Sequence, residues 1–352
     1  MSSLERLGWN PFFEEQRARL GRPELRFARV VEAQRGAWKV AGEFDGWTGI
    51  SGRYRHESAS GADFPAVGDW VGIIDAIVHT RLGRKSTVSR AAAGRAVDEQ
   101  IVAANVDTIL LVTALGDDTR DLNPRRLERY LTMVWEAGAV PVVVLNKADL
   151  SGDPEGDAAS LRARLPFVDV VAISALGVDP IAVLDRYLQP AQTVALLGSS
   201  GVGKSTLINR LLGAEALRVS GIRSDGRGRH TTTARQLVEL AGGALLIDTP
   251  GMRELTPWAD EAAVESAFDD IAMLAASCRF GDCAHEGEPG CAVAAAVETG
   301  RLDADRLENY RRLLREAAFE ERKRDKAAAA EHKRKWKQLH QAAKALYKAR
   351  DR

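Results

Sequence analysis

Nine consecutive residues, 198–206, have the composition and spacing of a loop that binds phosphate groups. The stretch GSSGVGKST fits the pattern G-x-x-x-x-G-K-[ST] and lies between an apolar run, 193–197, and a helix-like run, 206–213. Glycines let the backbone approach a ligand closely, and a helix start offers N–H groups and positive potential to phosphate oxygens. We expect Lys204 to reach the β- and γ-phosphates of a nucleotide and the Ser205 hydroxyl to ligate Mg²⁺. The expected phosphate site comprises Gly198, Ser199, Ser200, Gly201, Val202, Gly203, Lys204, Ser205 and Thr206.

A second motif, Asn-Lys-x-Asp, favours guanine over adenine as the base. A carboxylate at Asp149 accepts hydrogen bonds from both the ring N1–H and the exocyclic amine of guanine, and adenine does not offer this pair of donors. Asn146 is expected either to meet the base or to brace the loops, and the stem of Lys147 to cover the face of the base. The stretch ISAL, 173–176, is expected to supply backbone N–H groups near guanine O6. The expected base-side residues are Asn146, Lys147, Asp149, Ser174 and Ala175, and an ATPase is the weaker interpretation.

Two further stretches carry groups suited to hold Mg²⁺ and to sense the γ-phosphate. In DTPG, 248–251, Asp248 is expected to hold Mg²⁺ through water and the N–H of Gly251 to donate to the γ-phosphate. The polar stretch SDGRGRHTTTARQ, 224–236, is expected to become ordered when GTP and Mg²⁺ bind. Thr232 is favoured to complete the Mg²⁺ shell, although the sequence does not separate it from its two threonine neighbours, Thr231 and Thr233.

The usual residue that orients the attacking water is absent from its expected place in the sequence. Many switch GTPases place a Gln directly after the glycine of Asp-x-x-Gly, and this chain has Met252 there, whose thioether does not orient water. Intrinsic turnover is therefore expected to be slow, with the missing group supplied by another side chain or by a partner. His230 is the nearest candidate in the chain, and an RNA contact or an exposed loop histidine are its alternatives. The expected catalytic residues are Lys204, Ser205, Asp248 and His230.

All three cysteines of the chain fall within one short segment, which favours a metal site over disulfides. Cys278, Cys283, His285 and Cys291 follow the spacing C-x4-C-x-H-x5-C. Three thiolates and one imidazole make a closed tetrahedral Zn²⁺ site, which is structural because no position is left for a substrate water. The alternative is a reduced helical core with a histidine on its surface.

The patterns around these motifs predict three kinds of architecture. Five short strand-like runs, 26–34, 37–44, 47–57, 65–75 and 76–83, alternate with Gly-rich breaks and suggest a small antiparallel barrel. From Asp107 onward, strand-like and helix-like runs alternate, which predicts a sheet covered by helices on both faces. After about residue 260 the patterns are helical. The expected domains are 1–95, 96–258 and 259–352.

The base-reading motif precedes the phosphate loop, the reverse of the usual order in switch GTPases. Joining the old chain ends and cutting elsewhere preserves the neighbours in a sheet, so the order predicts a circular permutation. The permutation also puts the predicted barrel and the predicted helical segment on either side of the switch, and we expect the state of the phosphate to reorient them.

Composition sets further limits. No apolar run among the 352 residues approaches the roughly 20 needed to span a bilayer, and the acidic start is no secretory signal, so a cytoplasmic location is expected. The formal net charge is zero, yet residues 321–352 hold 12 Lys or Arg against 4 Asp or Glu, which suggests a polyanionic partner or else a solvated helix. Basic side chains expected to meet RNA phosphates are Arg53, Arg55, Arg84, Lys85 and Arg90. The aromatic residues Trp38, Trp47, Tyr54 and Trp70 are expected in the barrel core more often than stacked on bases.

Together these motifs resemble the circularly permuted GTPases, specifically the ribosome small-subunit-dependent GTPase A (RsgA) family. The resemblance covers nearly the whole chain and rests on VGDWV, RKSTVSR, EQIVAANVDTILLVTA, LNKADL, GSSGVGKSTLIN, GRGRHTTT, DTPGMREL and the cysteine cluster. It implies an N-terminal all-β OB barrel, a central permuted α/β P-loop GTPase and a C-terminal α-helical zinc domain.

The functional implications of the resemblance are equally specific. It implies Mg²⁺-dependent hydrolysis of GTP to GDP late in maturation of the small (30S) ribosomal subunit, stimulated by that subunit and its 16S rRNA, with Zn²⁺ as a further cofactor. A monomer without membrane contact is expected. The competing hypothesis is an RNA-binding assembly scaffold with GTP as a structural or switch ligand. The rRNA helices contacted are not indicated by the sequence.

Overall fold

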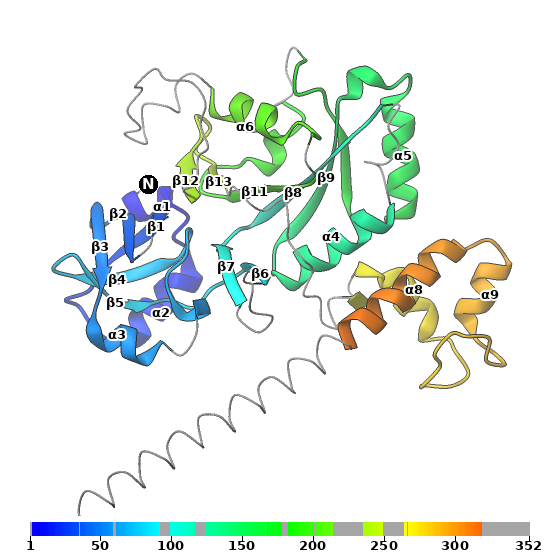
Figure 1. The fold of residues 1–352 in the computed structure, drawn as a ribbon, viewed down its shortest axis with the longest axis horizontal. Helices are drawn as coiled ribbons and strands as arrows, with labels where there is room; N and C mark the ends of the chain where they lie inside the picture. Colours follow the sequence, from blue (N-terminus) through cyan, green and yellow to red (C-terminus); the bar gives the residue numbers. More distant parts are fainter. Residues whose placement is uncertain are drawn as a thin grey trace, which may run out of the picture. The chain divides into compact units, whose positions relative to one another are not determined.

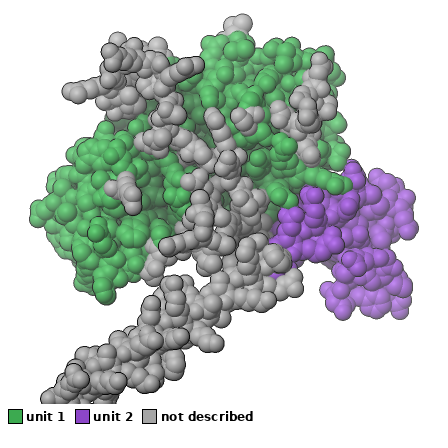
Figure 2. Space-filling view, in the orientation of Figure 1, with its two compact units in different colours: residues 1–92, 98–257 green, residues 93–97, 258–352 purple. Residues whose placement is uncertain are grey.

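The structure is a computed structural model that describes residues 2–34, 36–58, 61–91, 99–116, 124–165, 167–177, 182–199, 201–213, 235–248, 264–265 and 267–318. Two compact units make up the chain (Figure 2). The first joins residues 1–92 to 98–257, and the second joins 93–97 to 258–352. No helix in the described part of the chain is long and apolar enough to cross a membrane.

A five-stranded barrel lies near the amino terminus of the first unit (Figure 1). Its strands are β1 (Arg26–Gln34), β2 (Ala37–Gly42), β3 (Gly46–Ile50), β4 (Trp70–Ile74) and β5 (Ile77–Arg81). Strand β1 pairs antiparallel with both β2 and β4, while β5 pairs with β3 and β4 and closes the circle. The predicted barrel is therefore confirmed, but it is not antiparallel throughout, because β3 and β5 pair in parallel. Helices α1 (Ser3–Arg6) and α2 (Pro11–Leu20) add Leu4 and Phe13 to a cluster around Trp70.

One predicted strand of the barrel is wrong in its second half. The run 47–57 continues from β3 into helix α3 (Gly52–Glu57) instead of staying extended. The Ser51 hydroxyl accepts a hydrogen bond from the backbone N–H of Tyr54, which is how a serine caps the start of a helix. Alternation of apolar and polar residues did not reveal this cap. A short 3-10 turn, η1 (Gly61–Asp63), precedes β4.

The centre of the first unit is a mostly parallel sheet. Its strands are β8 (Thr108–Ala114), β9 (Val140–Asn146), β10 (Asp169–Ala172), β11 (Thr193–Leu197), β12 (Arg235–Glu239) and β13 (Leu245–Asp248), in the order β10-β9-β8-β11-β13-β12. Only β12 runs antiparallel to its neighbour β13. A separate ribbon pairs β6 (Thr87–Ala91) with β7 (Glu99–Ala104).

Helices cover both faces of this sheet, as the sequence predicted. One apolar cluster contains Leu127 and Leu131 of α4 (Pro124–Glu136) and Leu161 of α5 (Pro154–Arg164). A second cluster on the other face contains Leu207 and Leu211 of α6 (Lys204–Leu212). Successive strand residues enter alternate clusters, because side chains alternate between the two faces of a strand. Short 3-10 turns, η2 (Ala148–Leu150) and η3 (Asp185–Tyr187), lie in the connections.

The barrel and the central sheet share backbone pairing. Strand β12 pairs with β1 at Gln236 opposite Glu32 and at Arg235 opposite Ala33. This contact extends the central sheet into the barrel as one 11-stranded sheet. The buried guanidinium of Arg29 reinforces the junction by donating to the carbonyl oxygens of Leu7, Gly68 and Asn105.

The second unit is helical, with α8 (Asp269–Ala275), α9 (Ala292–Glu298) and a helical stretch at 304–318. Its core contains Phe268, Ile271 and Tyr310, together with the buried Cys291. The guanidinium of Arg306 packs 4.5 Å over the Phe268 ring and pairs with Asp270 at 2.6 Å. An α-helical fold for this part of the chain is confirmed.

Candidate nucleotide site and cysteine cluster

The topology gathers the predicted nucleotide motifs at one edge of the central sheet. The chain runs from β8 outward through β9 to β10, and then returns to the opposite side of β8 as β11. Ligands of open α/β sheets bind at such a switch point, beyond the carboxyl ends of the strands. Because β9, β10, β11 and β13 are parallel, Asn146, Ile173, Gly198 and Asp248 follow or end strands at this same edge.

The phosphate loop follows β11 and continues into the first turn of α6. A Cβ on Gly198, which has φ +151°, would lie 2.0 Å from the carbonyl oxygen of Val112. A Cβ on Gly203, which has φ +95°, would lie 2.2 Å from Nδ2 of Asn146. Both positions therefore require glycine. The Lys204 Nζ donates to the carbonyl oxygen of Gly198 at 2.8 Å and to that of Ser199, so the loop curls around the ammonium group.

Asn146 connects the phosphate loop to the base-side loop. Its side chain is 2% exposed, its Nδ2 donates to the carbonyl oxygen of Val202 at 2.8 Å, and its Oδ1 accepts from the backbone N–H of Ala175 at 2.9 Å. Of the two roles expected for Asn146, the geometry supports bracing. The N–H of Ala175 already donates to Asn146, so in this conformation it does not point to a guanine O6 as expected.

The base-side loop is held by further side chains. The Ser174 hydroxyl donates to Oδ1 of Asp149, which lies exposed in η2. Lys147 adopts a left-handed conformation with φ 60° at the start of this turn. From α6, Arg210 donates to the carbonyl oxygens of Ala175 at 3.2 Å and Gly177 at 2.7 Å. The base-side and phosphate-side loops are therefore tied together twice.

The remaining predicted residues divide between described and undescribed parts of the chain. Ser205 is exposed in the first turn of α6, Thr206 is half-buried beside it, and Asp248 ends β13 opposite Gln236. Ser200, His230, Thr231, Thr232, Thr233, Gly251 and Met252 lie outside the described residues, as does the basic tail.

One residue at the site was missed by sequence reasoning. Arg126, in the first turn of α4, donates from Nη1 to the Ser199 hydroxyl at 2.8 Å. It stands in the run PRRLERYL, whose charges read as the solvated face of an amphipathic helix. No local motif marks an arginine that reaches the phosphate loop from another helix.

The four predicted metal ligands come together in the second unit. Their ligand atoms all lie within 4.8 Å of one another. The Cys278 Sγ lies 3.9 Å from the Cys291 Sγ, and these sulfurs lie 3.7 and 3.5 Å from Nδ1 of His285. Tetrahedral Zn²⁺ with bond lengths of about 2.3 Å to sulfur and about 2.0–2.1 Å to nitrogen sets sulfur separations of about 3.8 Å and sulfur to nitrogen separations of about 3.6 Å. The cluster therefore fits a zinc site, and its cysteines form no disulfide.

Local electrostatics bear on the protonation of these ligands. Burial lowers the pKa of His285, which favours the neutral imidazole that a metal requires. Burial raises the pKa of the Cys283 thiol to about 12. Burial acts in the same direction on Cys278, but hydrogen bonds from the backbone of Val293 and Ala292 outweigh it and hold that pKa below its ordinary value. Metal binding at this cluster is therefore coupled to proton release.

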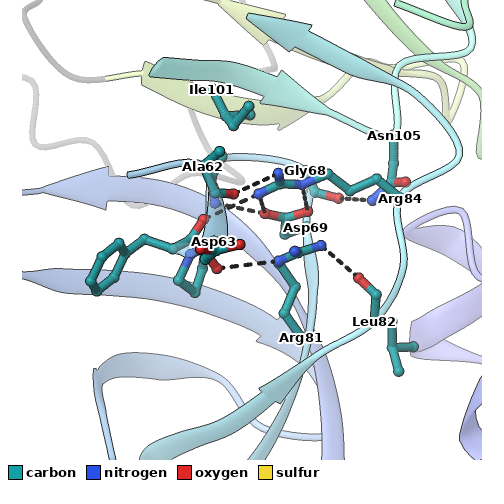
Figure 3. Close-up of polar contacts among 12 residues, drawn as sticks. Ala62, Asp63, Gly68, Asp69, Arg81, Leu82, Arg84, Ile101 and Asn105 are labelled. Carbon is teal, nitrogen blue, oxygen red and sulfur yellow. Dashed lines mark hydrogen bonds and ion pairs between the residues drawn. The ribbon is translucent and has the colours of Figure 1, made fainter. Parts of the chain in front are cut away.

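The expected RNA contacts of the barrel need correction at Arg84. Its side chain is 9% exposed and pairs with the fully buried Asp69 through Nη2 to Oδ2 at 2.7 Å and Nε to Oδ1 at 2.8 Å (Figure 3). It also donates to the carbonyl oxygens of Ala62 and Phe64. Such a buried bidentate pair is structural, so Arg84 does not face RNA.

The other aromatic and basic residues that were expected in the barrel differ in how far they are buried. Trp38 and Trp70 are in the core at 6% and 0% exposed, Tyr54 is half-buried, and Trp47 is 46% exposed. Lys85 pairs with Asp107, and Arg53 pairs with Glu57 on the surface. Of these four aromatic residues, Trp38 packs in the apolar cluster inside the barrel as expected. Trp70 instead packs against the amino-terminal helices, and Tyr54 lies in helix α3.

A parallel sheet with Asn-Lys-x-Asp before the phosphate loop, and both at one edge, defines a circularly permuted P-loop GTPase. The family model described as RsgA GTPase matches residues 81–258. A small ribosomal subunit biogenesis GTPase RsgA of Opitutus terrae is 43% identical over 360 residues, which cover 97% of each chain. A protein of the same description from Methanosarcina acetivorans is 47% identical over 266 residues, covering 74% of this chain and 71% of the relative. The chain belongs to the RsgA GTPase family, as its resemblance predicted.

Solved structures agree with this assignment. YjeQ from Thermotoga maritima is 25% identical, covers 84% of this chain and 99% of its own, and superposes with a TM-score of 0.63. YloQ, described as a circularly permuted GTPase, covers 84% of this chain and 96% of its own with a TM-score of 0.60, and at 24% identity it supports the fold alone. The predicted permutation is confirmed.

Proposed function

We propose that this GTPase hydrolyses GTP to GDP and phosphate during late maturation of the small (30S) ribosomal subunit, and that the subunit stimulates hydrolysis. The single observation that carries the nucleotide chemistry is the buried Asn146 side chain, which joins the phosphate loop to the base-side loop. The partner is supported by the relatives, which are described as small ribosomal subunit biogenesis GTPases. A scaffold with an inert nucleotide is less well supported, because the relatives are described as GTPases.

The residues are assigned proposed roles from their positions. Asp149, oriented by the Ser174 hydroxyl, would accept from the two guanine donors, and the stem of Lys147 would cover the base. Lys204 would exchange its loop carbonyl acceptors for phosphate oxygens, which are stronger acceptors because they are charged. The backbone N–H groups of the loop would hold the remaining phosphate oxygens.

Hydrolysis requires little covalent chemistry from the protein. A water oxygen attacks the γ-phosphorus, the bond to the β–γ bridging oxygen breaks, and the electron pair of that bond stays on GDP while the proton of the water is lost to solvent or base. Ser205 and Asp248, both at the carboxyl edge of the sheet, suit Mg²⁺, which neutralises developing charge when bound. Thr232 remains the proposed additional ligand and His230 the proposed water-orienting residue, and both lie outside the described residues.

The cysteine cluster is proposed to hold one structural Zn²⁺ through Cys278, Cys283, His285 and Cys291. Its ligands pack against Val293 and the other residues of the helical core, so the metal would hold this core together. The proposed domains are 1–95, 96–258 and 259–352. The proposal further assigns the protein to the cytoplasm as a monomer that binds 16S rRNA.

Phosphate release from GTP tests this proposal. It is measured with the purified chain alone, with isolated small subunits, and with isolated large subunits as the control. We expect stimulation by small subunits only, and loss of that stimulation in a Lys204→Ala variant. Equal rates with and without small subunits would favour the scaffold and contradict the proposal.

A further inference from the structure

Arg126 is a cation at the phosphate loop that none of the predicted motifs contains. Its Nη1 donates to the Ser199 hydroxyl at 2.8 Å, while Nζ of Lys204 donates to the carbonyl oxygen of the same Ser199. A guanidinium from α4 and an ammonium from α6 thus meet at one residue of the loop. Two helices on opposite faces of the sheet supply these cations, so their meeting is a product of the tertiary fold.

The position of Arg126 within α4 is unfavourable for helix stability. The first turn of this 13-residue helix carries Arg125 and Arg126 and no acidic residue. The amino end of a helix bears partial positive charge, which disfavours cations there. A residue that breaks a local rule is expected at sites where function compensates for the local cost.

The position of Lys204 indicates which phosphate group of the nucleotide lies closest to Arg126. A lysine at the position of Lys204 bridges the β- and γ-phosphates of the nucleotide. Because Lys204 and Arg126 meet at Ser199, Arg126 is near the terminal end of the triphosphate rather than the α-phosphate. A phosphate oxygen is a stronger acceptor for a guanidinium than the neutral Ser199 hydroxyl.

We propose that Arg126 is a phosphate-contacting residue of the nucleotide site, whose guanidinium leaves the Ser199 hydroxyl and binds the γ-phosphate of GTP. The inference rests on the proposed GTP site and deepens it. It gives the site a means to distinguish GTP from GDP, because GDP lacks the group that Arg126 binds. A brace that only holds Ser199 in place would affect both nucleotides alike.

Nucleotide titration of four variants separates these two roles. The variants are Arg126→Ala, Arg126→Gln, Ser199→Ala and the double variant Arg126→Ala/Ser199→Ala, with Arg162→Ala as the matched control. Arg162 is also a helix arginine that makes a hydrogen bond outside its own helix, in its case from α5 to the backbone carbonyl oxygen of Val170 at 3.0 Å. Affinities for a non-hydrolysable GTP analogue and for GDP are measured by fluorescence, with circular dichroism as the check on folding.

We expect Arg126→Ala to weaken the GTP analogue about tenfold or more, the loss typical of a hydrogen bond to a charged group, and to weaken GDP about threefold or less. Ser199→Ala should change both affinities about threefold or less, and Arg126→Ala should retain its selective effect in that background. Arg162→Ala should behave as the wild type.

Equal losses for GTP and GDP, or an Arg126 effect that disappears in Ser199→Ala, would overturn the inference in favour of a brace. If Arg126→Ala fails to fold, Arg126→Gln, which keeps a long polar side chain without the charge, must show the same selective loss. Failure of the proposed GTP site itself looks different, because the wild type would then bind neither guanine nucleotide.

Discussion

Replacing Asn146 by alanine removes the side chain that joins the two halves of the nucleotide site. Two backbone groups lose their partners, the carbonyl oxygen of Val202 and the N–H of Ala175, at a position that is 2% exposed. An unsatisfied buried group costs about 1–3 kcal/mol, so Asn146→Ala is expected to lower the free energy of unfolding by about 2–6 kcal/mol if the loops stay in place. If the loops instead relax to reach water, less stability is lost and the site is no longer preorganised.

Asn105 offers a matched control for this experiment. It is also buried, at 5% exposed, and also makes two such bonds, from Nδ2 to the carbonyl oxygen of Gly68 at 3.0 Å and from the N–H of Lys85 to Oδ1 at 2.9 Å. Its φ of 55° adds a cost for alanine, so Asn105→Ala should destabilise at least as much as Asn146→Ala. It lies at the amino end of β8, away from the carboxyl edge.

The assay compares chemical denaturation with GTP affinity for both variants. Asn146→Ala should weaken GTP binding by about tenfold or more, which corresponds to about 1.4 kcal/mol or more of binding free energy. Asn105→Ala should bind GTP as tightly as the wild type. Equal loss of GTP affinity in the two variants would refute the reasoning, because the effect would then follow stability in general. So would unchanged GTP affinity in a folded Asn146→Ala protein.

Three further outcomes are expected. Arg84→Ala should cost about 3–5 kcal/mol in denaturation because it strands the buried carboxylate of Asp69. Arg53→Ala, which removes an exposed surface pair, should leave the denaturation midpoint nearly unchanged, and the reverse ranking would contradict the structural role of Arg84. Arg29→Ala should lower the free energy of unfolding by about 3 kcal/mol or more, because buried carbonyl oxygens lose their donor. Burial lowers the pKa of Arg29 only to about 10, so the guanidinium stays charged and the loss should be the same at pH 6 and pH 8. A loss that differs between these two pH values would contradict a permanently charged Arg29. Chelation of zinc should unfold the helical second unit while GTP still binds, and Cys283→Ser should have the same effect. An unchanged thermal unfolding transition after either change would contradict a structural metal.

The sequence predicted the elements with strong periodicity and the residues held in motifs with a fixed backbone geometry. Strands β8 to β11 are apolar runs, and the phosphate loop lies between β11 and α6 as its glycine pattern requires. The cysteine cluster was predicted because its four side chains have a spacing typical of ligands of one metal ion, and the structure brings them together. Order along the chain was enough to predict the permutation.

Features that depend on contacts between distant elements were not predictable. Arg84 and Arg53 look alike in sequence, yet Arg84 is buried against Asp69 and Arg53 faces solvent. The Arg126 contact with Ser199 joins α4 to a loop 73 residues away. Helix α3 arose from a single serine cap against an extended pattern. Side-chain direction and capping decide these cases, and periodicity carries neither.

The most direct test of the nucleotide site is a change of base specificity. In Asp149→Asn an amide donor replaces one carboxylate oxygen, and xanthine carries a carbonyl oxygen where guanine carries its exocyclic amine. We expect Asp149→Asn to lose affinity for GTP and to gain affinity for xanthosine triphosphate, and Lys204→Ala to weaken the binding of both nucleotides. Unchanged preference for GTP in Asp149→Asn would contradict the claim that Asp149 and the phosphate loop bind one and the same nucleotide.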